Sequence, residues 1–173
     1  MHRNELSVPN EAYELAEAST DQELLERLSK SHSHFVRGAV ARNTNIGAQT
    51  HSRLLKDERR GVQAWALTHS LTSREAFEEI FARYIQQPYC SIMHPTLAGH
   101  HHVHISELIT LLERKKWLIT MEVLNNTSHF ETKAFKEMVK PLTALREAEP
   151  GSDDRIVGRL AFKRVHGHYP YHA

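Results

Sequence analysis

Histidines are the residues of this chain whose number and clustering could indicate a metal-binding site. There are 14 of them among 173 residues, and neutral imidazole is a common metal ligand. Structural zinc sites usually include cysteine, however, and Cys90 is the only cysteine. No HExxH pattern places two ligands on one helix face, so we predict no metal site, no cofactor, an exposed histidine loop and a frayed tail. The clusters are His32 and His34; His100, His101, His102 and His104; and His166, His168 and His172.

Other signatures of catalysis are also missing from the sequence. The chain contains no nucleophile elbow, no P-loop and no paired-cysteine motif. We interpret Asp57, Asp153 and Asp154 as turn or cap residues, and we predict that the protein is not an enzyme and has no catalytic residue. The enzyme alternative would need a pocket that joins residues 100–104 to a carboxylate. In that case, removal of metal would change the melting behaviour.

A helical repeat is the element expected to position any functional side chain. Apolar residues recur at helical spacing, and only 7 glycines and 6 prolines interrupt the chain. Similar residues also recur at a fixed distance, which is the mark of a repeat protein. The pairs and triplets that lie 26 apart are Leu28, Leu54 and Ile80; Val36 and Val62; Val40, Ala66 and Ile92; and Asn43 and His69.

The repeat register shifts by five residues in the middle of the chain. Leu108 matches Phe77 at a spacing of 31, and Asn126 matches His69 at 57, which is twice 26 plus five. We assign the inserted residues to 95–104, because that segment contains a proline, a glycine and four histidines.

Each repeat unit is predicted to contain two short helices in one all-α domain that covers residues 1–173. Such helices are marginal alone and must stack to bury their apolar stripes. Thr20 with Glu23, Thr72 with Glu75, and Ser128 with Glu131 have the spacing of a capping box. The predicted elements are an N-terminal capping helix (9–18), helical repeats (20–164) and a tail (165–173). Within the repeats, first helices are expected at 20–30, 46–56, 73–85, 104–114 and 129–140, and second helices at 33–42, 60–69, 87–94, 116–126 and 154–164.

The segment 35–43 (FVRGAVARN) resembles the second helix of a HEAT-like repeat, and more closely that of the leucine-rich repeat variant, whose core is VR..VA.N. Residues 61–67 (GVQAWAL) are a degenerate copy, so the resemblance covers about 24–81. It implies a right-handed α-solenoid of about five helix pairs, with the second helices lining a shallow concave face. Proteins of this architecture are mostly scaffolds and binding modules. They include small bacterial immunity-type proteins and a class of DNA glycosylases that are longer and more basic.

The predicted partner is another protein, bound through the second helices by a non-catalytic module or scaffold, for example of the immunity or inhibitor type. Trp65 lies beside a stripe predicted to face the core, and its counterpart in a later unit is Glu122, so it should be partly exposed. An exposed tryptophan is a typical hot spot of binding, although tryptophan is more often buried. The predicted contact residues are Trp65, Arg42, Gln63, Thr68 and Asn125.

Arg37 is predicted to have a structural role. In HEAT-like repeats the matching arginine often ties one unit to the next through an acidic turn residue. Gln63 and Thr120 replace this arginine in later units, so we do not expect a continuous ladder.

The net charge of +1 indicates no strongly polar partner, but its distribution supports an alternative. Equivalent turns line up along one edge of a solenoid, and here these turns are basic. A nucleic-acid-binding HEAT-like protein would use this edge, with an affinity that falls steeply with salt. Glu58 and Glu113 dilute the pattern, and solvated turns are usually charged. The residues of this basic edge are Arg53, Lys56, Arg59, Arg60, Lys115 and Lys116.

The compartment predicted from the sequence is the cytoplasm. A single cysteine cannot form an intrachain disulfide, which suits a reducing environment. No signal peptide is recognisable, and no window reaches the roughly 18 apolar residues of a membrane span. We therefore expect no interaction with a membrane.

Overall fold

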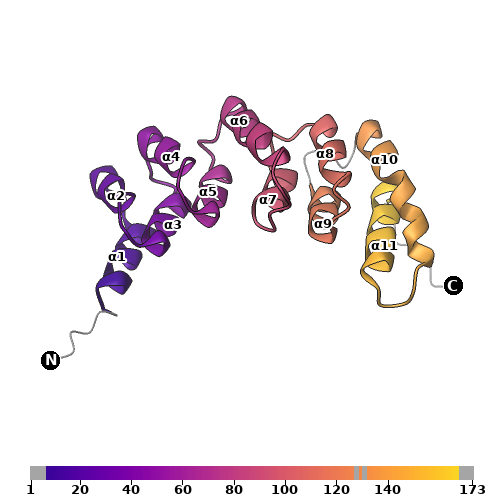
Figure 1. The fold of residues 1–173 in the computed structure, drawn as a ribbon, viewed down its shortest axis with the longest axis horizontal. Helices are drawn as coiled ribbons and strands as arrows, with labels where there is room; N and C mark the ends of the chain where they lie inside the picture. The colour runs from indigo at the N-terminus through magenta and orange to yellow at the C-terminus, as the bar shows by residue number, and fades with distance from the viewer. Residues whose placement is uncertain (1–6, 127–128, 130–131, 168–173) are drawn as a thin grey trace. The chain divides into compact units, whose positions relative to one another are not determined.

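A computed structural model describes residues 7–126, 129 and 132–167 of the chain. Within these residues the regular structure is entirely helical, with eleven α-helices and one 3-10 helix (Figure 1), so the all-α prediction is confirmed. None of the described helices has the length and apolar character needed to cross a membrane. The chain divides into two compact units, Met1–Ile80 and Phe81–Ala173, and each is described by itself below.

The helices of the first unit pack in two different ways. α3 packs between α1 and α5. α2 packs on α3, the next helix along the chain, and α4 packs on α5 in the same way. The helices expected near 9–18, 20–30, 33–42, 46–56 and 60–69 are all present, with slightly different ends. They are α1 (Ser7–Ala18), α2 (Gln22–Leu28), α3 (His34–Arg42), α4 (Ala48–Leu54) and α5 (Arg60–Leu67), followed by the start of α6 (Arg74–Ile85).

The core of the first unit follows the repeat. Val36 and Val40 on α3 and their counterparts Val62 and Ala66 on α5 are all buried, as the 26-residue spacing predicts. Burial of these side chains supplies the stabilisation that seven- to nine-residue helices lack on their own.

Two of the predicted capping boxes are wrong by one residue. Asp21, and not Thr20, caps α2, because its carboxylate accepts from the backbone N–H groups of Glu23 and Leu24. At the start of α6, the hydroxyl of Ser73 accepts from the N–H of Ala76. Thr72 is buried instead and donates its hydroxyl to the carbonyl of Ala66. The predicted pair Ser128 and Glu131 lies outside the described residues, as do His168 and His172.

The second unit contains the remaining elements. α9 packs between α7 and α11, and α8 packs on α7 and α9. The 3-10 helix η1 packs against α11 and was not predicted from the sequence. The elements are α7 (Met93–Gly99), α8 (Ile105–Leu112), α9 (Trp117–Asn125), α10 (Lys133–Val139), η1 (Lys140–Glu147) and α11 (Asp153–His166).

The helix predicted over 87–94 is wrong, and so is the assignment of the insertion to 95–104. α4 has 7 residues and α6 has 12, so the five extra residues lengthen α6. The next helix then begins only at Met93. Ile92 is 47% exposed and is therefore not the counterpart of Ala66; that counterpart is the buried Leu97, at a spacing of 31.

Gly158 explains how η1 can lie so close to α11. A Cβ atom built on Gly158 would overlap the backbone of Leu145 and Arg146. Only a residue without a side chain permits this approach of two helices, so Gly158 allows η1 to pack directly on α11.

Candidate protein-binding surface

Arg42 is the centre of an exposed polar and aromatic cluster on the first unit. It occupies the last position of α3, and its Nη2 group donates to the Tyr13 hydroxyl at 2.6 Å and to Glu17 Oε1 at 2.8 Å. The Tyr13 hydroxyl in turn donates to Glu17 at 2.7 Å. The guanidinium carbon lies 5.1 Å from the centre of the Trp65 ring, within the range of a cation–π contact.

Trp65 is partly exposed, as its repeat counterpart Glu122 predicts. Its side chain is 48% exposed and lies over α3, where a Cβ on Gly38 would be 4.0 Å from Trp65 Cδ1. The Arg42 guanidinium lies over the indole, and about half of the tryptophan remains in solvent. A held, half-exposed tryptophan loses little conformational freedom when a partner covers it.

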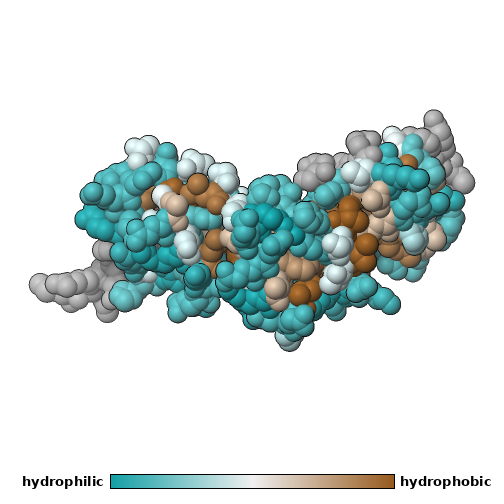
Figure 2. All heavy atoms as spheres, turned by 90° about the horizontal axis from the view of Figure 1, so that it is seen from above, coloured by the Kyte–Doolittle hydropathy of each residue, from teal (hydrophilic) through white to brown (hydrophobic). Residues whose placement is uncertain are grey.

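Phe35 extends the same face of α3. It lies seven residues before Arg42, which is close to two helical turns, and is 67% exposed. On the face drawn in Figure 2, hydrophilic side chains prevail and apolar ones form small separate patches. We call Tyr13, Glu17, Phe35, Arg42 and Trp65 the Trp65 surface.

Only part of the predicted contact set belongs to the Trp65 surface. Thr68 is exposed one turn after Trp65 and donates its hydroxyl to the Trp65 carbonyl. Gln63 is a correction, because it is buried and its amide donates to the carbonyl of Asp57. Asn125 is exposed in the second unit, where its Oδ1 accepts from Arg164 at 3.4 Å.

Tyr13, Glu17 and Phe35 were not predicted from the sequence as contact residues. Tyr13 and Glu17 are on α1, which lies before the residues that carry the repeat motif. The signal that was available for Phe35 is its place directly before the VR..VA.N core, on the side away from Val36.

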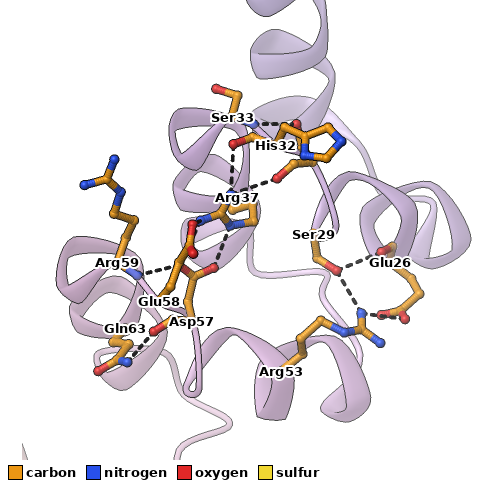
Figure 3. A network of polar contacts seen from close by, with 11 residues as sticks. Glu26, Ser29, His32, Ser33, Arg37, Arg53, Asp57, Glu58, Arg59 and Gln63 are labelled. Carbon is orange, nitrogen blue, oxygen red and sulfur yellow. Dashed lines mark hydrogen bonds and ion pairs between the residues drawn. The ribbon is translucent and has the colours of Figure 1, made fainter.

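Arg37 has the structural role predicted for it. Its Nε and Nη2 groups donate to the two carboxylate oxygens of Asp57 at 2.6 and 3.0 Å (Figure 3). Nη2 also reaches Glu58 at 3.2 Å, and Nη1 donates to the carbonyls of Ser31 and His32. The arginine thus joins the α2–α3 turn to the α4–α5 turn with both partners buried.

Ionisation of this network is favoured by its own contacts. The hydrogen bond with Asp57 raises the pKa of Arg37 above its usual value. Burial opposes ionisation of Asp57, but hydrogen bonds from Arg37 and from the N–H of Arg59 outweigh it, so the pKa of Asp57 is lowered. Asp57 is therefore a turn residue in an ion pair, as interpreted from the sequence, and Asp153 and Asp154 lie in the first turn of α11, which Ser152 caps.

Three buried polar side chains bind backbone carbonyls at the ends of neighbouring helices. They are Asn43, His69 and Asn126. Asn43 donates to the carbonyls of Ala16 and Ser19 at 2.9 Å, and Asn126 donates to the carbonyl of Ala98 at 2.8 Å. His69 Nε2 lies 3.2 Å from the carbonyl of Asn43, and its Nδ1 accepts from the N–H of Leu71. These side chains satisfy carbonyls that a helix end leaves without a partner.

No group of three or more His, Cys, Asp or Glu side chains in the described part of the chain could hold a metal ion. The expected exposed loop is partly wrong, because His100 is buried and its Nδ1 accepts from the N–H of His102, while His101 and His104 are exposed. His51 is also buried, and this burial lowers its pKa.

The basic edge is only partly available in either unit. Arg53 is held by Glu26 and Ser29, whereas Lys56, Arg59 and Arg60 are exposed in the first unit. Lys115 and Lys116 are exposed in the second unit, where the ammonium group of Lys116 lies 5.6 Å from the centre of the Tyr89 ring.

Comparison of the chain with protein-family models, with curated proteins and with solved structures finds no match. The geometry of the chain itself therefore carries the functional argument.

Proposed function

We propose that this protein is a non-catalytic binding module whose first unit docks another protein on the Trp65 surface. The observation that carries the proposal is Trp65 itself, half-exposed and held over α3 by the Arg42 guanidinium. Tryptophan, tyrosine and arginine are the residues that most often dominate binding energy at protein interfaces. A scaffold or an inhibitor of the immunity type would use such a surface by covering part of its partner.

The proposed architecture is a short right-handed α-solenoid of HEAT-like or leucine-rich-repeat-variant units. The support is the packing of second helices on one another, α3 on α5 in one unit and α7 on α9 in the other, with a first helix beside each. Repeat proteins of this kind use their second helices to present extended binding faces. The cytoplasm suits the module, because its one cysteine cannot form an intrachain disulfide.

Partner capture from the native cells tests the proposal. Tagged wild-type protein is compared with a Trp65→Ala/Arg42→Ala variant, with nuclease added to both. The matched control is Trp117→Ala, which removes an exposed tryptophan of the second unit. We expect a protein that survives nuclease, is retained by the control and is lost with the double variant.

Nucleic acid bound instead of protein would contradict the proposal. Such binding would weaken steeply with salt, would not respond to Trp65→Ala/Arg42→Ala, and would respond to loss of Arg59 or Lys56. That result would move the function to the basic edge.

A further inference from the structure

A polar cleft lies on the first unit, where the turn after α2 and the turn after α4 approach each other. It encloses about 350 Å³ and is open to solvent. Figure 3 labels some of the residues that line it, with Arg37 beside Asp57 and Glu58, and with Arg53 reaching toward Glu26 and Ser29. The charged residues that line the cleft are Lys30, Arg37, Arg53, Lys56, Asp57 and Glu58.

Positive charge exceeds negative charge around the cleft. Four cations and two carboxylates line it, and Glu26 behind Arg53 adds one more carboxylate, which leaves an excess of one positive charge. Both oxygens of Asp57 already accept from Arg37, so that pair forms a neutral wall. Lys30 and Arg53 share the single carboxylate of Glu26, so the excess positive charge lies on these two residues and Lys56, and the cleft should prefer an anion.

One edge of the Arg53 guanidinium is available to an anion. This edge, formed by Nε–H and Nη2, is the one that binds pairs of oxygen atoms. Its Nη1 group is anchored to Glu26 at 2.6 Å and to Ser29 at 2.9 Å. The Nε–H and Nη2 groups have no acceptor among the described residues. This is the edge with which Arg37 grips the two oxygens of Asp57, and it matches carboxylate and phosphate oxygens in the same way.

Two lysines flank Arg53 at equivalent places of the repeat. Lys30 and Lys56 are 26 residues apart, and each follows the first helix of its pair. Lys30 shares Glu26 with Arg53 at 3.2 Å, and Lys56 forms no ion pair with any described residue. Glu58 is exposed and touches Arg37 through one contact of 3.2 Å, so it can turn toward solvent when an anion enters.

We propose that this cleft binds a phosphate monoester group, with the Arg53 fork on two of its oxygens and Lys30 and Lys56 on either side. The Arg37–Asp57 ion pair and the carboxylate of Glu58 bound the cleft, which suits a terminal phosphoryl group better than a continuous phosphate backbone. This site involves none of the residues of the Trp65 surface. Phosphate binding in the cleft is therefore independent of protein binding at the Trp65 surface.

Amide NMR spectra of the 15N-labelled full chain test the proposal. Inorganic phosphate and a short phosphoserine peptide are titrated separately at constant ionic strength. We expect saturable shifts at the turns around Ser31 and Lys56 with both probes. Tighter binding of the peptide would identify a phosphorylated protein as the source, and equal binding would identify a free phosphate ester or phosphate ion.

Three variants decide whether the site is built as described. Lys56→Gln should weaken phosphate binding about tenfold, while the control Arg59→Gln, an exposed cation beside the cleft, should leave it unchanged. Arg53→Lys keeps the charge and removes the fork, so it should also weaken binding. Equal weakening by Lys56→Gln and Arg59→Gln, or full binding by Arg53→Lys, would overturn the proposal.

Two further results would also overturn it. One is the absence of saturable shifts with either probe. The other is binding of a single-stranded oligonucleotide that exceeds binding of the phosphoserine peptide and depends on Arg59, which would replace a monoester site by a track for phosphate diesters.

Discussion

The two units use arginine differently to hold their turns. In the first unit, Arg37 binds the carboxylate of Asp57 and carries two further backbone contacts. In the second unit, Arg114 donates to two backbone carbonyls, those of Ile85 and Gln87. Arginine thus forms an ion pair in the first unit and hydrogen bonds to neutral carbonyls in the second. The turns of the two units are therefore held by the same residue type with different electrostatics.

The largest effect should come from breaking the ion pair of Arg37 with Asp57. Arg37→Gln leaves Asp57 buried without its cation and should lower the free energy of unfolding by about 3–5 kcal/mol. Arg114→Gln removes hydrogen bonds to carbonyls and should cost about 1–3 kcal/mol. Urea unfolding measures both losses, and hydrogen exchange shows which unit opens. Equal losses for the two variants would contradict the comparison.

A glycine in each unit gives the next largest effect. Gly158→Ala should destabilise the second unit by about 1–3 kcal/mol, because the added Cβ overlaps the backbone of η1. Its control is Gly61→Ala on α5, where a Cβ meets nothing within 4 Å, and this change should stabilise the protein by up to about 1 kcal/mol. Thermal melting distinguishes the two directions. A Gly158→Ala protein as stable as wild type would refute the packing described for η1.

The helical class and the buried positions of the first unit could be predicted from the sequence, because similar residues recur 26 apart. Val36 and Val62, and Asn43 and His69, are buried in both copies. The position of α7 could not be predicted from the register of Ala66 and Ile92, because the lengthened α6 shifts every later residue by five. The spacing of 31 between Ala66 and Leu97 carried the right signal.

The candidate surface was only partly predictable. The exposure of Trp65 followed from its polar counterpart in another unit. Gln63 was placed on the surface, yet it fills the position of Arg37 one repeat later, and so it is buried at the same kind of turn. Tyr13 depends on how α1 packs on α3, and no repeat spacing marks it.

The amide side chains are features that the two units share. Asn43→Ala and Asn126→Ala should each cost about 1–3 kcal/mol, because each leaves buried carbonyls without a donor. Urea unfolding of the two variants tests this similarity. A loss confined to one of them would show that the helix ends, like the arginine contacts, differ between the units.

Acid should weaken the first unit in two steps. His51 is buried and its pKa is lowered from 6.5, so the unfolded chain binds a proton first and stability falls as the pH drops below 6.5. The pKa of Glu26 is lowered from 4.5 to about 2, chiefly by a hydrogen bond from Thr50, so its contribution is lost as the pH falls from 4.5 toward 2. Hydrogen exchange across this range measures both steps. His51→Gln should abolish the first step alone, and an unchanged profile would rule out this residue as its cause.

The smallest effect on stability should come from the Trp65 surface. Trp65→Ala removes a half-exposed ring and should change the free energy of unfolding by less than about 1 kcal/mol. Thermal melting beside Trp117→Ala checks this. A large loss would mean that Trp65 serves the fold, and its exposure would then not argue for binding.

Site-specific photo-crosslinking in the native cells tests whether the Trp65 surface binds a protein. A photoreactive residue replaces exposed Thr68, beside Trp65, or exposed Gln49 on α4 as the control. If the Trp65 surface binds a protein, position 68 should crosslink to one protein and position 49 should not. The crosslink from position 68 should be lost when Trp65→Ala is added. A crosslink that persists without Trp65, or that joins nucleic acid, would contradict protein binding at this surface.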